Sequence, residues 1–381
     1  MLPIHPQPLP GEILSSWMVR LAFSNGFPLH TFYSGLLGFK EALWNLDIDR
    51  HPSEQLLNLL SLHTRQPVAT LRDMTLCGYE GILFPELLTH GDVRWLLPLG
   101  LYHRNRKRAG MQYCPLCLRT DVVPHYRLAW RIALVVVCPL HHCVMEGLCP
   151  QCRSPMMFHR HGVGREKFPY VAHLRQCHQC GLNLGDVSPR FPDWPDCHSL
   201  EFLIALITHA ELSPWRYLQI LTPCAIPFFN GLRVLLGLLN GRYGPRFDPV
   251  FCGELGCEGL PHLPLAFEYM DVERRLQLML RACWLLQDWP ARFVECCRVA
   301  HLSRSRITEF PDQLPFWFDA GISQLDQRVY SPSEEEVTTA IACLSNHGRQ
   351  PSWRSIAELF LVRPGCSKRL YKVWKSLTDL G

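Results

Sequence analysis

The chain has 381 residues, of which 48% are hydrophobic, 19% charged and 11% aromatic. This composition excludes a largely disordered chain, and the length predicts two or three domains. The formal net charge of +4 excludes a general polyanion binder, so any nucleic-acid surface must be local. The longest apolar run falls short of the roughly 20 residues of a membrane-spanning helix, and the N-terminus lacks the pattern of a signal peptide. We expect a cytoplasmic protein that does not contact membranes.

The first hundred residues predict an all-α unit. A first helix follows a Pro-Gly start and stops at Asn25-Gly26, and a second is expected from Pro28 to about Leu37, as in a helix-turn-helix. Two further short helices are expected around residues 54–63 and 67–76. The apolar face of the first helix consists of Leu14, Trp17, Met18, Leu21 and Ala22.

Paired cysteines begin after residue 111, and in a reducing compartment such pairs bind metal more often than they form disulfides. Zinc prefers four ligands in a tetrahedron, and two cysteines separated by two residues supply half of them. Cys114 and Cys117 form one such pair, and Cys138 and His141 offer two more ligands at the same spacing. We assign His141 because it keeps the two-residue gap. His142 and Cys143 are the alternatives.

A second set follows at once, with Cys149 paired to Cys152 and Cys177 paired to Cys180. Four paired elements within about seventy residues indicate two zinc ions in a double zinc ribbon. Both sets of four are full, which favours structural zinc. A catalytic zinc would need an open position and a nearby base, and Glu146 and His178 lie close in sequence, yet a zinc surrounded mainly by thiolates is usually structural.

Helical patterns resume near Ser199, after the connector SPRFPDWPDC, and include a long amphipathic segment over about residues 265–286. Residues 290–310, with Ser303 as a helix cap, and residues 351–377 each resemble a helix-turn-helix. The predicted fold is mainly α with small zinc-ribbon β elements. The predicted domains are a helical helix-turn-helix-like domain, a double zinc-ribbon region and a helical C-terminal domain, over residues 1–110, 111–190 and 191–381.

The stretch PxPGExLSSWxxRLAxxNG, read together with the zinc block, resembles the TniQ/TnsD family of transposon target-selection proteins over roughly residues 5–185. The motif residues include Ser16-Trp17, Arg20-Leu21-Ala22 and the Asp47–Asp49 stretch. The resemblance implies a non-enzymatic adaptor that recruits an AAA+ ATPase of the TnsC type to a chosen DNA site. It also implies one of two modes: association with CRISPR Cascade and its guide RNA, often as a homodimer, or direct reading of target DNA in the TnsD manner.

Cations near the C-terminus are the candidate nucleic-acid contacts, because no acidic residue lies between Gly365 and Thr378. A solvated helix face and a protein interface are the alternatives. The same alternatives hold for the cluster Arg104, Arg106, Lys107 and Arg108, and for Arg304 with Arg306. The candidate nucleic-acid residues are Arg363, Lys368, Arg369, Lys372 and Lys375.

The remaining motif residues favour structural roles. Trp17 shares a helix face with apolar residues and is expected in the core, and Arg20 is expected to hold Asp47 or Asp49. The pair Cys296-Cys297 is interpreted as buried packing. A third metal at Cys252, Cys257 and His262 is disfavoured, because no second paired element accompanies them.

Overall fold

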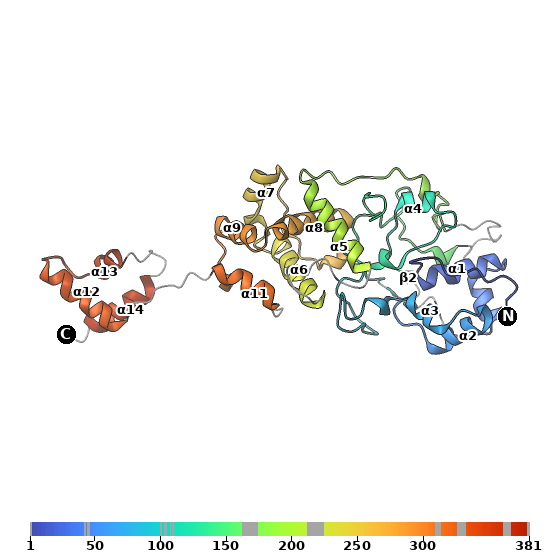
Figure 1. Ribbon diagram of the computed structural model, residues 1–381, viewed down its shortest axis with the longest axis horizontal. Coiled ribbons are helices and arrows are strands. Elements are labelled where there is room, and N and C mark those ends of the chain that lie inside the picture. The colour runs from blue at the N-terminus through green and yellow to red at the C-terminus, as the bar shows by residue number, and fades with distance from the viewer. Residues whose placement is uncertain are drawn as a thin grey trace. The chain divides into compact units, whose positions relative to one another are not determined.

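Helices dominate the computed structural model of the chain (Figure 1). It divides into two compact units, Met1–Ser323 and Gln324–Gly381. The one sheet among the described residues pairs β1 (Leu101–Tyr102) with β2 (Asn105–Arg106), so the predicted mainly α fold is confirmed. The boundaries predicted near residues 110 and 190 lie inside the first unit and stay predictions.

The structure describes residues 2–41, 43, 46–99, 101–102, 105–106, 108, 110–161, 174–211, 225–308, 314–325, 333–360 and 367–378.

Helix α1 (Leu14–Ser24) buries its apolar face completely, and Trp17 has no exposed surface, as expected. Its N-cap residue, Ile13, has no side chain that can accept a hydrogen bond. Asp49 supplies the cap instead, because its carboxylate accepts from the Ser15 amide at 2.8 Å and from the Ser15 hydroxyl at 2.7 Å. The start of α1 therefore depends on a residue 34 positions away.

The other short helices of the first hundred residues form where the sequence predicts them. Ser53 caps α2, and Arg65 ends that helix in the left-handed conformation at φ 61°. The helix after Pro28 is a π-helix over most of its length. Its helix-turn-helix interpretation stays a prediction. The elements are η1 (Thr31–Leu36), α2 (Glu54–Thr64), α3 (Val68–Asp73) and η3 (Leu76–Tyr79).

The cysteine-rich region is built mostly from turns. The apolar run over residues 132–137 makes only isolated bridges, from Ile132 to Leu96 and from Val137 to Val144. Its side chains are almost wholly buried, so it acts as a core segment without a sheet partner. The regular pieces are α4 (Pro115–Thr120), η4 (Leu128–Arg131), η5 (Phe158–Arg160) and η6 (Leu184–Asp186).

Helix α8 (Val272–Gln287) is the central helix of the later part of the first unit and packs against both α5 (Cys197–Glu211) and α6 (Ala225–Asn240) (Figure 1). It begins seven residues later than the amphipathic pattern from Leu265, because Asp271 caps it by accepting from the Arg274 amide at 2.7 Å. The further helices are η7 (Gly244–Arg246), α7 (Asp248–Leu255), η8 (Phe267–Tyr269), α9 (Ala291–Val299), α10 (Arg304–Ile307), α11 (Phe316–Ile322) and η9 (Ser323–Leu325).

The start of α10 differs from its prediction. Ser303 occupies the N-cap position of α10, but its hydroxyl makes no cap and lies 3.0 Å from the Ser305 hydroxyl, so the predicted cap is wrong. In the preceding helix, Cys296 and Cys297 are buried, as expected. Within the described residues, no helix is long and apolar enough to cross a membrane.

A buried carboxylate joins the N-terminal and helical parts of the first unit. Glu268 accepts a hydrogen bond from the Trp95 amide at 2.6 Å and two from the Arg233 guanidinium, both at 2.7 Å. Trp95 also packs edge-on against Phe267 and Phe229. This paired and hydrogen-bonded charge holds α6 and η8 to the loop that carries Trp95.

The second unit is a three-helix domain of α12 (Glu334–Asn346), α13 (Trp353–Leu359) and α14 (Ser367–Thr378). A capping box of Ser333 and Glu336 starts α12. The Trp374 indole donates to the Pro351 carbonyl at 2.9 Å, which ties α14 to the start of α13. The buried core consists of Val337, Ala340, Leu344, Ile356 and Leu370.

Candidate metal centres

The first candidate centre brings together ligand atoms from two pairs. Cys114, Cys117, Cys138 and His141 place these atoms within 4.8 Å of one another. The His141 Nδ1 lies 3.3 Å from the Cys117 sulfur and 3.6 Å from the Cys138 sulfur, and those two sulfurs are 3.6 Å apart. Two sulfurs on one zinc lie about 3.8 Å apart when each Zn–S bond is about 2.3 Å. The spacing is therefore that of a tetrahedral centre.

Three of the four ligand pairs sit in the same tight turn. The amide of the residue four positions after the first cysteine donates to its carbonyl, at 2.8 Å for Cys138 and 2.9 Å for Cys149 and Cys177. The cysteine amide in turn donates to the carbonyl of the fifth residue, at 2.8–2.9 Å. The fourth residue is left-handed in each turn, with φ of 54° at His142, 59° at Arg153 and 79° at Gly181.

This turn separates His141 from its neighbours. His142 occupies the left-handed position and its side chain is exposed, so its role is to close the turn. Cys143 is buried, and its sulfur lies 3.4 Å from the Cys114 sulfur, beside the group of four but not among them. The structure thus brings His141 into the group in preference to either alternative.

The remaining pair, Cys114 and Cys117, is held by a helix start. Cys114 is the N-cap of α4, and its sulfur accepts from the Cys117 amide at 3.3 Å. Pro115 follows as the first helical residue, where its missing amide hydrogen costs nothing. Gly185 fits against the backbone of this helix, because an added Cβ would lie 3.2 Å from the Arg119 backbone.

The second candidate centre consists of Cys149, Cys152, Cys177 and Cys180, again within 4.8 Å of one another. The sulfurs of Cys149 and Cys180 are 3.6 Å apart, as are those of Cys152 and Cys177. Cys149 and Cys177 are buried, whereas Cys180 is exposed. This centre lies nearer to solvent than the first.

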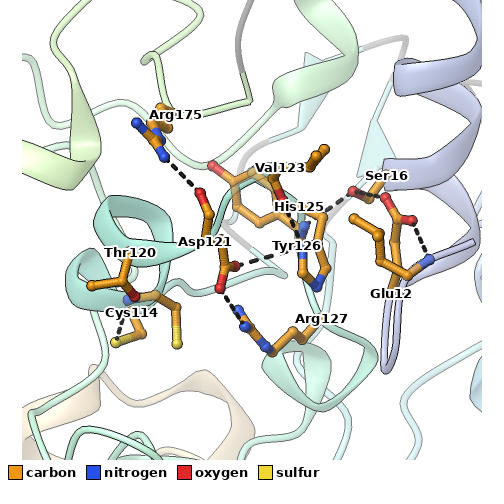
Figure 2. A network of polar contacts seen from close by, with 12 residues as sticks. Glu12, Ser16, Cys114, Thr120, Asp121, Val123, His125, Tyr126, Arg127 and Arg175 are labelled. Atoms are coloured by element: carbon orange, nitrogen blue, oxygen red, sulfur yellow. Dashed lines mark hydrogen bonds and ion pairs between the residues drawn. The ribbon is translucent and has the colours of Figure 1, made fainter. Parts of the chain in front are cut away.

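Asp121, directly after α4, is the hub of a polar network beside the two centres (Figure 2). Its carboxylate pairs with Arg127 at 3.0 Å and with His125 at 3.5 Å, and its carbonyl accepts from Arg175 at 2.7 Å. Burial lowers the pKa of Arg127, but its hydrogen bond to Asp121 and the nearby Cys117 raise it overall. The network links the loop after α4, which lies between the two ligand pairs of the first centre, to Arg175, two positions before Cys177.

The N-terminal motif attaches to the same loop. The Ser16 hydroxyl accepts from the Tyr126 amide and donates to Glu12, both at 3.0 Å, as Figure 2 shows. The Ile13 amide donates to the Tyr126 carbonyl at 3.0 Å. The polar residues of the motif therefore make internal contacts that hold α1 to the cysteine-rich region.

Arg20 pairs with Glu12, so its predicted pairing with Asp47 or Asp49 is wrong. Its Nε donates to Glu12 Oε1 at 2.8 Å, and a second nitrogen lies 2.5 Å from Oε2. Asp47 instead makes two hydrogen bonds, of 2.9 and 2.7 Å, with the buried Arg131. Arg131 lies 84 positions from Asp47, and no local pattern in the sequence points to it.

The other cysteine groups differ from these centres. Cys252 donates to the Cys257 carbonyl at 2.9 Å, and His262 contacts the Asn240 carbonyl, so these three do not form a metal-ligand group in the described structure. One further cluster among the described residues lies wholly exposed on α5. It consists of Cys197, His198 and Glu201.

The candidate nucleic-acid residues fall around α14. Lys372 and Lys375 are exposed on that helix. Lys368 and Arg369 belong to α14, although the positions of their side chains are not described, and Arg363 lies outside the described residues. In the first unit, Arg304 pairs with Asp319 at 2.7 Å, and Arg306 donates to the His301 carbonyl at 3.3 Å.

These features define a mainly helical protein with two cysteine-rich groups that can hold metal ions. The family model for TniQ matches residues 3–145, which include α1 and the whole first centre. The chain thus carries a TniQ domain, which supports a role in target selection for transposition. No curated protein matches it.

Proposed function

We propose that the chain is a non-enzymatic adaptor that links a target-bound complex to the AAA+ ATPase of a transposition machinery. The target-bound complex in this proposal is CRISPR Cascade with its guide RNA, and the ATPase is of the TnsC type. The TniQ match over residues 3–145 carries the proposal. The polar network of α1 supports a rigid domain, because its motif side chains face inward and leave other surfaces for partners.

We propose that both cysteine-rich groups hold zinc in a structural role. The first group has three cysteines and one histidine, and the second has four cysteines. Both are ligand sets of closed structural zinc sites. Each set supplies all four ligands and leaves no position for a reacting water. Binding energy at such sites contributes directly to folding.

A second candidate function, direct reading of target DNA, is favoured by the second unit. Leu370 is buried in its core, and Val373, Trp374 and Leu377 pack against that core. Tyr371, Lys372 and Lys375 lie on the exposed part of α14. A helix that presents lysines and an aromatic side chain from a small helical domain suits contact with a duplex.

Affinity purification of the tagged full chain from its native host, with nuclease treatment and mass spectrometry, separates the two functions. The adaptor proposal predicts recovery of the ATPase together with Cascade subunits. Recovery of the ATPase alone favours direct DNA reading. Recovery of neither would contradict the adaptor proposal.

Titration of duplex DNA at several salt concentrations tests the second unit. If α14 binds phosphates, Lys372→Glu with Lys375→Glu weakens binding and reduces the salt slope by about 1 for each phosphate that the lysines no longer neutralise. Lys40→Glu is the matched control, because Lys40 is exposed in the first unit. Equal binding by all variants would remove α14 from the interface.

A further inference from the structure

A groove of about 640 Å³ lies beside the second metal centre. Its walls come from five parts of the first unit, which are residues 97–98, residues 108 and 110–112, residues 145–155, Arg190, and residues 268–275 around the start of α8. The volume lies within the range of about 300–1,000 Å³ that is usual for ligand pockets. Neither the metal groups nor the exposed lysines of α14 account for it.

The floor of the groove is apolar and adaptable. Met111, Met145 and Met270 line it, and their side chains are almost fully buried. Methionine is flexible and polarizable, and it is common on surfaces that bind peptides of varied sequence. Gly147 lies in the wall, where an added Cβ would meet only Val272, at 3.8 Å.

A buried cation that has no ionic partner among the described residues also lines the groove. Arg275 is 2% exposed, and its guanidinium donates to two neutral acceptors, the Ala133 carbonyl and, at 3.1 Å, the Gln112 side chain. Its Nε makes no hydrogen bond within the described part of the chain. A buried charge is costly unless an opposite charge compensates it. Asp271 and Glu268 act on this charge without forming an ion pair with it, and an anionic group in the groove would add to their compensation.

The charged side chains on the rim of the groove also favour an anionic ligand. Arg108 stacks on the Tyr269 ring at 3.9 Å, and the exposed Arg153 pairs with no carboxylate of the residues that the structure describes. The groove carboxylates already have partners. Glu146 and Glu273 pair with Arg190, Glu268 pairs with Arg233, and Asp271 caps α8.

We infer that this groove is a docking site for a peptide segment of a partner protein, one that carries apolar side chains and at least one carboxylate. The apolar side chains pack on the methionine floor, and the carboxylate faces Arg275, Arg108 and Arg153. Nucleic acid fits less well, because the four carboxylates of the groove balance its four arginines and leave no net positive charge for a phosphate backbone, whereas a peptide with one carboxylate needs only a local cation. The inference is independent of the role proposed for α14.

Selection from a phage library of random 12-residue peptides on the immobilised, zinc-loaded full chain tests this inference. The selected sequences are expected to combine apolar residues with Asp or Glu. Fluorescence anisotropy with the synthetic peptides then compares variants. Arg108→Glu with Arg153→Glu removes the rim cations, and Gly147→Phe fills the groove without changing its charge.

Both changes should weaken peptide binding at least about tenfold, because the two new glutamates place like charges opposite the peptide carboxylate and the new phenylalanine occupies the space of the apolar side chains. Lys40→Glu should leave it unchanged, because Lys40 is exposed and does not line the groove. Zinc content, measured on each variant, verifies that the fold is intact. Four outcomes would each overturn the inference. They are a selection that yields no peptide, selected peptides that are rich in lysine, equal affinity of the peptide for all variants, and displacement of the peptide by duplex DNA.

Discussion

In each of the three tight turns, the residue in the left-handed conformation decides which neighbouring side chains can be metal ligands. At φ 54°, His142 turns the chain so that His141 and Cys138 face the same point. A non-glycine residue in the left-handed conformation costs conformational free energy, which the hydrogen bonds of the turn offset. His141 and His142 therefore differ sharply in role although they are adjacent.

Substitution of these two histidines should separate the roles. His141→Ala removes one of four ligands, so the zinc content of the purified chain should fall from two ions towards one. His142→Gly removes the left-handed cost and should raise the free energy of unfolding by about 0.5–1 kcal/mol, with two zinc ions kept. Native mass spectrometry and thermal unfolding measure both effects. Loss of zinc in the His142 variant alone would reverse the assignment.

The pair of Arg20 and Glu12 is nearly buried, with exposed fractions of 10% and 0% for the two side chains. Removing one partner leaves the other charge without compensation. Arg20→Ala should therefore lower the free energy of unfolding by roughly 2–4 kcal/mol, measured by chemical denaturation. Arg298→Ala breaks an exposed pair with Glu295 and should cost less than about 1 kcal/mol. Equal costs would show that the buried pair has no special role.

The two groups of cysteine and histidine side chains could be predicted from the sequence, because each pair is local and a two-residue gap is visible without a fold. The ionic partners could not be predicted, because no local pattern tells which of several carboxylates, near or far in the sequence, an arginine will contact. Arg20 bonds to Glu12 within its own motif, while Asp47 reaches Arg131 in the metal region. Likewise, Arg275 and Gln112 meet across 163 positions.

At the scale of elements, α1 shows how a helix can be completed from outside. Ile13 gives it no cap, and Asp49 replaces the missing acceptor. Burial raises the pKa of Asp49 to about 6, with Asp47 adding to the rise and Arg131 opposing it. The folded state therefore holds a proton on Asp49 at pH values where the unfolded chain has released it.

This difference predicts a pH dependence of stability. Between the unfolded pKa near 4 and the folded pKa near 6, the folded state binds more protons, so the free energy of unfolding falls as pH rises. Relative to Asp49→Asn, which keeps an acceptor but does not titrate, wild-type stability should fall by about 1 kcal/mol from pH 5 to pH 7. A difference that stays flat or rises would contradict the assignment.

Element types were more predictable than element ends. The helical periodicity located α1, α2 and α8, but α8 begins at Val272 because Asp271 caps it there. The run over residues 132–137 has the composition of a strand and the burial of a core segment. Local propensity could not decide its form, because a strand also needs a neighbouring strand to pair with.

At the scale of the whole molecule, the two units differ in what stabilises them. The first unit attaches α1, the loop after α4 and the second centre to one another through Ser16, Tyr126 and Asp121. The second unit has its own apolar core and none of the metal ligands. Metal ions bound at the two centres would therefore support the TniQ domain and its surroundings, while α12, α13 and α14 pack around an apolar core of their own.

Hydrogen-exchange mass spectrometry of the full chain, before and after metal removal under reducing conditions, tests this division most directly. If the two centres are structural zinc sites, chelation should remove protection from α1, α4 and the loops between them. Residues 333–360 should keep their protection. Unchanged protection of α1 in a chain shown to contain no metal would contradict the claim that these centres hold the TniQ domain together.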